Sequence, residues 1–75
     1  MLLSEMKIGQ KKVVVKIKDN GVGIKRLKQL GLTKGVTVEL VRVAPLGDPI
    51  EIKLRGFYLA LRKVQANKIV VGENE

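Results

Sequence analysis

Short runs of β-branched and aliphatic residues at alternate positions, separated by glycine-containing turns, recur along this sequence. Val and Ile fit a pleated, half-buried surface, so alternating runs of this kind predict strands. Five strands are expected, at residues 11–18, 36–44, 50–55, 58–61 and 68–71. Short strands linked by glycine turns are typical of an antiparallel sandwich or barrel.

One segment departs from the alternation and predicts a short helix over residues 23–30. Ile24, Leu27 and Leu30 recur there at a spacing of three, which places one apolar stripe on a helix. A glycine follows where helices commonly end with positive φ, and we expect the residue after it to fold back onto the helix end. Three glycines are expected to shape turns: Gly31, Gly35 and Gly56.

The chain length favours one small barrel. Seventy-five residues suffice for a single domain, which is expected over residues 1–75. At this size a closed barrel is favoured because closure removes exposed strand edges. A single helical turn, expected over residues 62–67, stands where an SH3-like barrel has one. The predicted fold class is therefore all-β with one short α-helix, in a small SH3-like five-stranded barrel.

The aromatic content restricts what can fill the core. Phe57 and Tyr58 are the only aromatic residues and make up 3% of the chain, so the core must be aliphatic. Neighbouring residues in a strand point to opposite faces, so one of these two side chains is expected in the core.

The phase of each strand predicts its buried face. Val13, Val15 and Ile17 share one face of the first strand, and this face is expected to be buried. An Asp at Val15 would then bury an unpaired charge and unfold the domain. In the second strand the hydrophobic phase changes between Leu40 and Val41, which predicts a bulge or a sharp bend.

The sequence contains neither Cys nor His. Zinc fingers, iron–sulfur sites and Cys–His or Ser–His–Asp catalysis are therefore excluded. Asp48 and Glu51 fall short of the roughly six to eight oxygen ligands of calcium. Gly21-Val22-Gly23 lacks the third glycine of a dinucleotide loop. No catalytic residue, metal site or cofactor is expected, and the chain is not expected to be an enzyme.

The net charge of +8 is concentrated in the first half of the chain. Residues 1–34 carry nine bases and two acids, whereas residues 35–75 carry six bases and five acids. Such asymmetry indicates an acidic partner, which would be nucleic acid, an anionic membrane surface or an acidic protein. The alternative is a solvated, lysine-rich surface that keeps a small domain soluble.

A loop between two prolines, at residues 45–49, is the first candidate for partner binding. Pro45 and Pro49 fix φ and lower the entropy lost on binding. Leu46 at the tip would be an exposed apolar anchor. The alternative is a structural loop, in which Gly47 and Asp48 shape the turn and Leu46 covers one end of the barrel.

The basic face of the expected helix is the second candidate. It carries Lys25, Arg26 and Lys28. Positive charge in the first helical turn opposes the helix macrodipole, which favours a use for Lys25 and Arg26. A solvated surface is again the alternative.

From residue 27 to residue 61 the chain reads L-K-Q-L-G-L-T-K-G, a strand, A-P-L-G-D-P, a strand and G-F-Y-L-A-L, and Arg62 follows. This order and spacing resemble the FeoA family, and A-P-L-G-D-P is the specific part. One departure is that Arg26 directly precedes Leu27, where the family has a residue between them. Further matching positions extend the resemblance over nearly the whole chain: Leu3, Met6, Gly9, Ala66, Ile69 and Val71.

The resemblance implies an SH3-like barrel and a non-enzymatic accessory role in bacterial ferrous iron uptake. It also implies docking on the cytosolic side of the FeoB membrane permease, which has a cytosolic GTPase domain. The chain is accordingly expected in the cytoplasm, held at the inner face of the membrane through its partner.

Other functions are weighed against this one. RNA binding by a small basic barrel is the alternative, motivated by the net charge, although single-strand binders normally stack bases on aromatic side chains. DNA binding is not expected, because the SH3-like domain of iron-dependent repressors normally follows a helix-turn-helix, for which this chain has no room. Weak homo-oligomerisation is left open.

Overall fold

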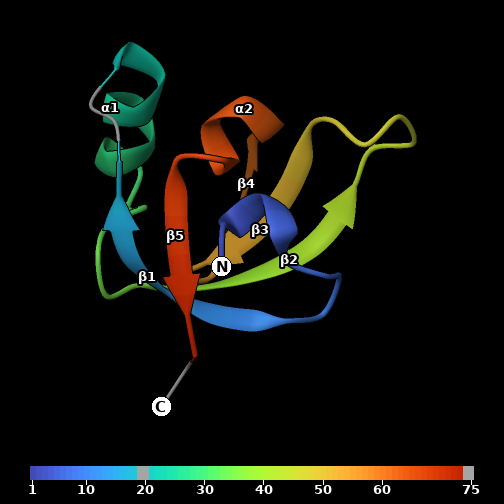
Figure 1. Ribbon diagram of the computed structural model, residues 1–75, viewed down its shortest axis with the longest axis horizontal. Coiled ribbons are helices and arrows are strands. Elements are labelled where there is room, and N and C mark those ends of the chain that lie inside the picture. Colours follow the sequence, from blue (N-terminus) through green and yellow to red (C-terminus); the bar gives the residue numbers. More distant parts are fainter. Residues whose placement is uncertain (19–20, 74–75) are drawn as a thin grey trace.

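The computed structural model describes residues 1–18 and 21–73 of the chain. Its centre is a strongly curved antiparallel sheet with the strand order β4-β3-β2-β1-β5 (Figure 1). The mostly β architecture with five antiparallel strands is therefore confirmed. The strands are β1 (Lys11–Ile17), β2 (Thr37–Val43), β3 (Ile50–Leu54), β4 (Phe57–Leu61) and β5 (Ile69–Gly72).

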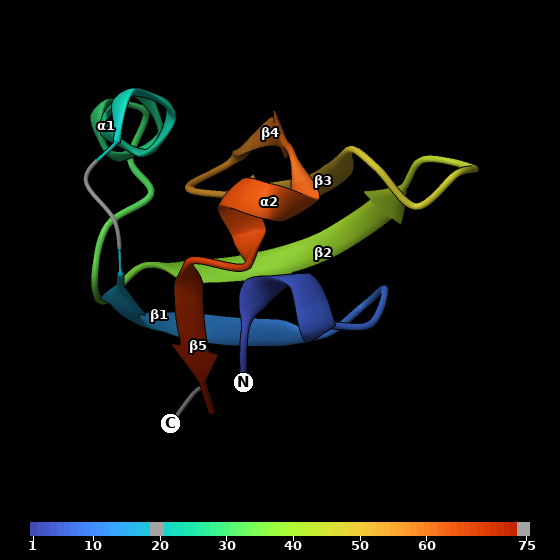
Figure 2. The same cartoon turned by 45° about the horizontal axis from the view of Figure 1, so that its top comes forward.

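In the described part of the chain, three helical segments accompany the sheet. The helix α1 (Val22–Gln29) lies to one side of the sheet, between β1 and β2 in sequence (Figure 2). The single turn α2 (Lys63–Ala66) joins β4 to β5 as expected. A short 3-10 helix, η1 (Leu3–Glu5), precedes β1 and is not evident from the sequence pattern.

The barrel is closed by curvature rather than by a full ring of strand pairing. Among the described residues β4 and β5 are the two edge strands of the sheet, and α2 connects them. The N-terminal segment covers part of the β5 edge, since Leu2 forms a bridge with Val70 and the Val71 N–H donates to the Met1 carbonyl at 2.8 Å. A fully closed barrel was expected from the chain length. Instead the sheet keeps two edge strands, and the N-terminal segment covers part of the β5 edge.

The core is aliphatic, as the low aromatic content requires. Its fully buried side chains come from every layer of the fold: Leu3, Val14, Leu32, Val38, Ile52, Leu54, Ile69 and Val71.

Neither aromatic residue enters this core, so the expectation that one of them would was wrong. Phe57 is 38% exposed and Tyr58 is 60% exposed. Phe57 pairs with Leu54 across a two-residue turn at the rim of the sheet, where little can cover it. Tyr58 lies opposite Lys53 on the outer face, with the Lys53 Nζ 5.7 Å from the ring centroid.

A β-bulge in β1 reverses the buried face that alternation predicts. Val14 pairs with Val71 and Lys16 pairs with Val70, so two steps along β1 match one step along β5. The extra residue is Val15, which is 41% exposed, while Val14 is fully buried. The prediction that Val15 faces the core was therefore wrong, because a bulge places residues three apart on the same face.

Lys12 shares the buried face of β1 with Val14. Its residue is only 9% exposed, and its Nζ lies 2.5 Å from the Glu73 Oε1 near the end of β5. The aliphatic stem is thus covered while the ammonium group reaches a carboxylate that is itself exposed, as long basic side chains commonly do.

The bulge predicted in β2 is confirmed. Leu40 pairs with Ile52 and Arg42 pairs with Glu51, so Val41 is the extra residue. The strand bends there, which keeps Leu40 buried while Val43 packs against the edge of the core.

The end of α1 follows the expected glycine-terminated geometry. Gly31 has φ +108°, its N–H donates to the Lys28 carbonyl at 3.0 Å, and the Leu32 N–H donates to the Leu27 carbonyl at 3.0 Å. These are the two hydrogen bonds of a Schellman motif. Leu32 folds back and is fully buried, whereas Leu30, which was expected on the apolar stripe, is 39% exposed because the helix ends before it.

The bulge in β1 predicts opposite outcomes for two neighbouring substitutions. Val14→Asp buries an unpaired charge and is expected to cost more than about 4 kcal/mol, close to the whole stability of a small domain. Val15→Asp places the charge at an exposed position and is expected to cost less than about 1 kcal/mol. Thermal unfolding followed by circular dichroism compares the two variants, and equal destabilisation would contradict the position of the bulge.

Candidate partner-binding surface

The loop of residues 45–49 joins β2 to β3 and extends from the edge of the barrel (Figure 1). The Gly47 N–H donates to the Ala44 carbonyl at 2.7 Å, and the Ala44 N–H donates to the Pro49 carbonyl at 3.0 Å. These two bonds form a tight turn that holds Leu46 outward, with 96% of the residue exposed. Of the two roles considered for Leu46, covering one end of the barrel is therefore wrong.

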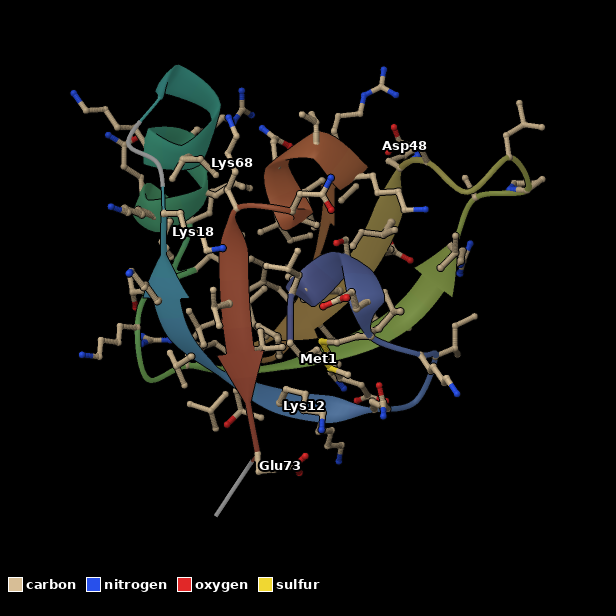
Figure 3. The ribbon with its side chains drawn as sticks, viewed as in Figure 1. Met1, Lys12, Lys18, Asp48, Lys68 and Glu73 are labelled. Atoms are coloured by element: carbon tan, nitrogen blue, oxygen red, sulfur yellow. The ribbon has the colours of Figure 1, made fainter. Side chains whose placement is uncertain are left out.

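Asp48 connects this loop to α2 (Figure 3). Its Oδ1 accepts a hydrogen bond of 2.9 Å from the backbone N–H of Lys63, the first residue of the helix. Its Oδ2 lies 3.7 Å from the Arg62 Nη1. The carboxylate thus satisfies one of the unpaired N–H groups of the helix start and fixes the base of the loop.

The surface beside the loop is hollowed. One hollow of about 340 Å³ is lined by residues of the loop, β4 and α2, including Pro49, Ala60 and Arg62. A second hollow of about 180 Å³ shares Pro49 and Ala60 and is also lined by Arg42. We group Leu46 at the loop tip with residues of these two hollows as one candidate surface, which we call the loop surface: Leu46, Pro49, Ala60, Arg42 and Arg62.

The sequence did not identify Ala60, Arg42 and Arg62 as members of this surface. They lie on three different elements, and only the pairing of β2, β3 and β4 brings them beside the loop. Strand alternation indicates that Arg42 and Ala60 face outward, but not that Ala60 lines both hollows beside the loop.

The basic residues of α1 lie on the other side of the molecule from the loop (Figures 1 and 2). Lys25 and Arg26 are exposed and Lys28 is half-buried. The structure therefore does not bring the two candidate elements together into one site.

The electrostatic argument for this helix face was wrong. The helix begins at Val22 and ends at Gln29, so Lys25 follows the first turn, and Arg26 and Lys28 lie in the last turn. Positive charge there is favourable, because it faces the negative end of the macrodipole. Arg26 and Lys28 therefore stabilise the end of the helix, so their position does not indicate an unfavourable charge kept for binding.

Gly21 and Gly23 lie at the start of this helix. The Gly21 carbonyl accepts from the Lys25 N–H at 2.9 Å at the start of α1. A Cβ on Gly23, the second residue of α1, would meet the Nε2 at the end of the flexible Gln65 side chain, which would have to move aside.

The carboxylates singled out by the sequence are engaged in ion pairs. Asp48 contacts Arg62 and Glu51 lies 3.5 Å from the Arg42 Nε. Within residues 1–18 and 21–73 no group of three or more metal-ligating side chains gathers. In the same part of the chain no helix has the length and apolar character to span a membrane.

Comparison with known proteins gives consistent results. Residues 1–73 match the model of the FeoA domain. A fusion of Fe(2+) transport protein A with the Fe(2+) transporter FeoB, from Porphyromonas gingivalis, is 37% identical over 71 residues. This match covers 95% of the present chain and 8% of the fusion protein, so the chain spans a small part of that relative.

Solved structures share the fold. The solution structure of FeoA from Chlorobium tepidum matches with a TM-score of 0.88 at 39% identity, over 95% of this chain and 68% of that chain. A zinc-complexed crystal structure of Stenotrophomonas maltophilia FeoA, described as a prokaryotic SH3 domain protein, matches with a TM-score of 0.84 at 33% identity. That match covers 96% of this chain and 89% of that chain, and it confirms the SH3-like fold class.

The bond between Asp48 and α2 predicts how the loop responds to substitution. Asp48→Ala removes the acceptor for the Lys63 N–H and is expected to cost about 1 kcal/mol of unfolding free energy. Asp48→Asn keeps an acceptor oxygen and is expected to retain most of that stability. Urea unfolding together with hydrogen exchange at the Lys63 amide measures both effects. Equal losses for Asn and Ala would show that the charge facing Arg62 matters more than the bond to the helix.

Proposed function

Because the chain belongs to the FeoA domain family, we propose that it is a non-enzymatic accessory module of bacterial ferrous iron uptake that docks on the cytosolic side of a FeoB-type permease. The observation that carries this proposal is the Porphyromonas gingivalis relative, in which the two proteins are joined in one polypeptide. Joining two chains keeps them at a high effective concentration, which suits partners that act in contact.

The loop surface has the properties of a docking site. Leu46 is a large apolar side chain held almost fully in solvent. The two prolines and the Asp48 bond to α2 restrict the loop before binding, so less conformational entropy is lost on association. Burying a leucine in a partner pocket contributes about 1.5–3 kcal/mol. Hollows on either side of Pro49 leave room for side chains of the partner.

RNA binding is the second candidate function. Both aromatic side chains are exposed at the β3–β4 hairpin, and Lys53 lies over Tyr58 there. Single-strand binders combine such aromatic and cationic groups. Fluorescence anisotropy with labelled oligouridine at several salt concentrations tests this function, since phosphate contacts give a steep decrease of log K with log salt.

Leu46→Ala tests docking on the permease. The soluble cytosolic region of the permease from the same organism is titrated by calorimetry, with GTP hydrolysis followed in parallel. We expect the substitution to weaken binding about 10- to 30-fold, because it removes most of the buried apolar area of one leucine.

Leu30→Ala is the matched control, since Leu30 is an exposed leucine next to α1, on the other side of the molecule. It is expected to leave the affinity unchanged. Equal weakening by both variants, or unchanged binding of Leu46→Ala, would show that docking does not use the loop surface. Absence of binding by the unmodified chain would contradict docking on this region of the permease.

A further inference from the structure

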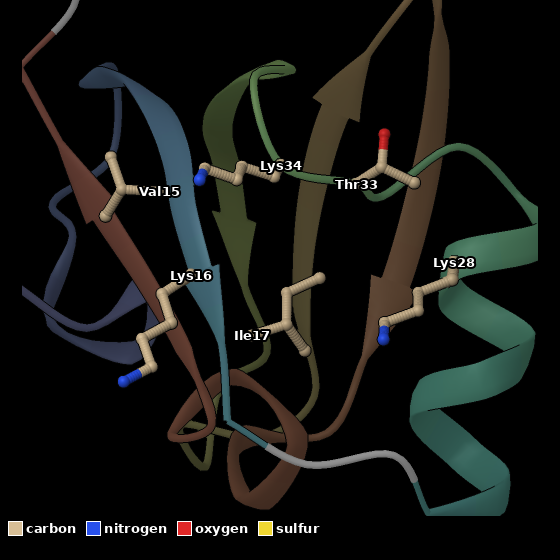
Figure 4. Close-up of a pocket in the computed structure, with 6 residues that line it drawn as sticks. All are labelled: Val15, Lys16, Ile17, Lys28, Thr33 and Lys34. Atoms are coloured by element: carbon tan, nitrogen blue, oxygen red, sulfur yellow. The ribbon is translucent and has the colours of Figure 1, made fainter.

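A groove of about 570 Å³ lies between β1 and α1 (Figure 4). We call it the lysine groove, and its lining residues are Val15, Lys16, Ile17, Lys28, Thr33 and Lys34. Its volume is typical of binding pockets, which span about 300–1,000 Å³. It is separate from the loop surface, since α1 and the loop of residues 45–49 lie on different sides of the molecule.

The groove exists because β1 is longer than the part of β2 that pairs with it. The β1–β2 ladder covers residues 11–13 and ends with bonds between Val14 and residues 35 and 36. On its other edge β1 pairs with β5 as far as Ile17. Among the described residues no strand therefore pairs with the groove side of β1 beyond Val14.

The backbone of Ile17 faces this groove. The Lys18 N–H donates to the Lys68 carbonyl at 2.8 Å, in the direction of β5, and Lys16 pairs with Val70 on the same edge. Hydrogen-bonded and non-hydrogen-bonded residues alternate along an antiparallel ladder, so the N–H and C=O of Ile17 point to the opposite edge. That edge offers backbone hydrogen bonds to an extended segment, as other sheet edges do for peptides.

The side chains around this edge combine apolar surface with positive charge. In Figure 4 Ile17 lies between β1 and α1, Lys28 reaches in from α1 and Lys34 reaches across from the turn. Lys16 lies on the side of β1 away from α1. Among the described residues, those that line the groove include three lysines, from β1, α1 and the turn before β2, and no acid.

We propose that the lysine groove binds an extended acidic peptide segment of a partner protein, which pairs with β1 beside Ile17. Alternate side chains of such a segment would lie toward Ile17 and toward Lys16. Aliphatic side chains suit the first position and carboxylates suit the second, with Lys28 and Lys34 adding positive charge around the site.

Two other anionic partners fit this site less well. A bilayer presents a broad surface that does not fill a recess between a strand and a helix, and it offers no backbone groups to the edge of β1. A single nucleic acid strand normally stacks its bases on aromatic side chains, and the described residues that line the groove include none.

Binding is tested with a fluorescein-labelled peptide of alternating Glu and Val, about eight residues long, by fluorescence anisotropy. Saturable binding with a Kd below about 1 mM is expected. A peptide of the same composition with its Glu and Val in separate blocks is expected to bind at least about fivefold more weakly, because it cannot place both residue types in register. A peptide with Lys in place of Glu is expected not to bind.

Charge reversal locates the site. The double substitution Lys16→Glu and Lys34→Glu is expected to weaken binding of the alternating peptide by at least about tenfold. Lys53→Glu combined with Lys63→Glu is the matched control, because both lysines are exposed, lie on β3 and α2, and give the same change in net charge. Amide chemical shifts of Ile17 and Lys34 are expected to move on binding by the unmodified chain.

Several outcomes would overturn the proposal. These are no binding of the alternating peptide, equal losses in the two double variants, or binding only to phosphatidylglycerol vesicles or to oligouridine. The Leu46→Ala variant is expected to bind the alternating peptide with unchanged affinity. Unchanged permease binding by Leu46→Ala, with peptide binding that depends on Lys16 and Lys34, would therefore reject the loop surface alone. Peptide binding that does not depend on those two lysines, with permease binding that depends on Leu46, would reject the lysine groove alone.

Discussion

The bends at two β-bulges are the constraint on which the rest of this structure depends. Val15 in β1 and Val41 in β2 are each the extra residue opposite a single step of the neighbouring strand. Bulges bend and twist a strand, so five short strands can curve around a core that contains no aromatic side chain. The same bend in β1 turns Val14 inward and leaves its last residues beside α1, where the lysine groove forms.

The two bulges also show what the sequence can and cannot predict. In β2 the apolar residues change from one face of the strand to the other between Leu40 and Val41. This change is evident in the sequence, so the bulge at Val41 could be predicted. In β1 Val13, Val14 and Val15 are consecutive, so both faces carry a valine and the sequence does not mark which of the three is the extra residue. The bulge at Val15 explains both why the predicted burial of Val15 was wrong and why Lys12 is unexpectedly buried.

The two candidate surfaces also differ in how much of each can be predicted from the sequence. The loop of residues 45–49 is continuous in sequence, and its two prolines are enough to predict that its backbone is restricted. The lysine groove draws its residues from a strand, a helix and a turn, so only the fold brings Lys16, Lys28 and Lys34 around one recess. The same holds for Ala60 beside Pro49. The hydrophobic periodicity of a sequence does not reveal which residues from distant segments come together in one site, whatever the charge of those residues.

The hydrogen bond from the Val71 N–H to the Met1 carbonyl has a consequence for how this domain can be tethered. It holds the first residue beside the last strand, at the side of the barrel away from α1 and from the loop of residues 45–49 (Figures 1 and 2). A polypeptide joined to Met1 would thus leave from beside β5. Such an attachment lies away from the loop of residues 45–49, so it would leave the loop surface free to face a larger protein.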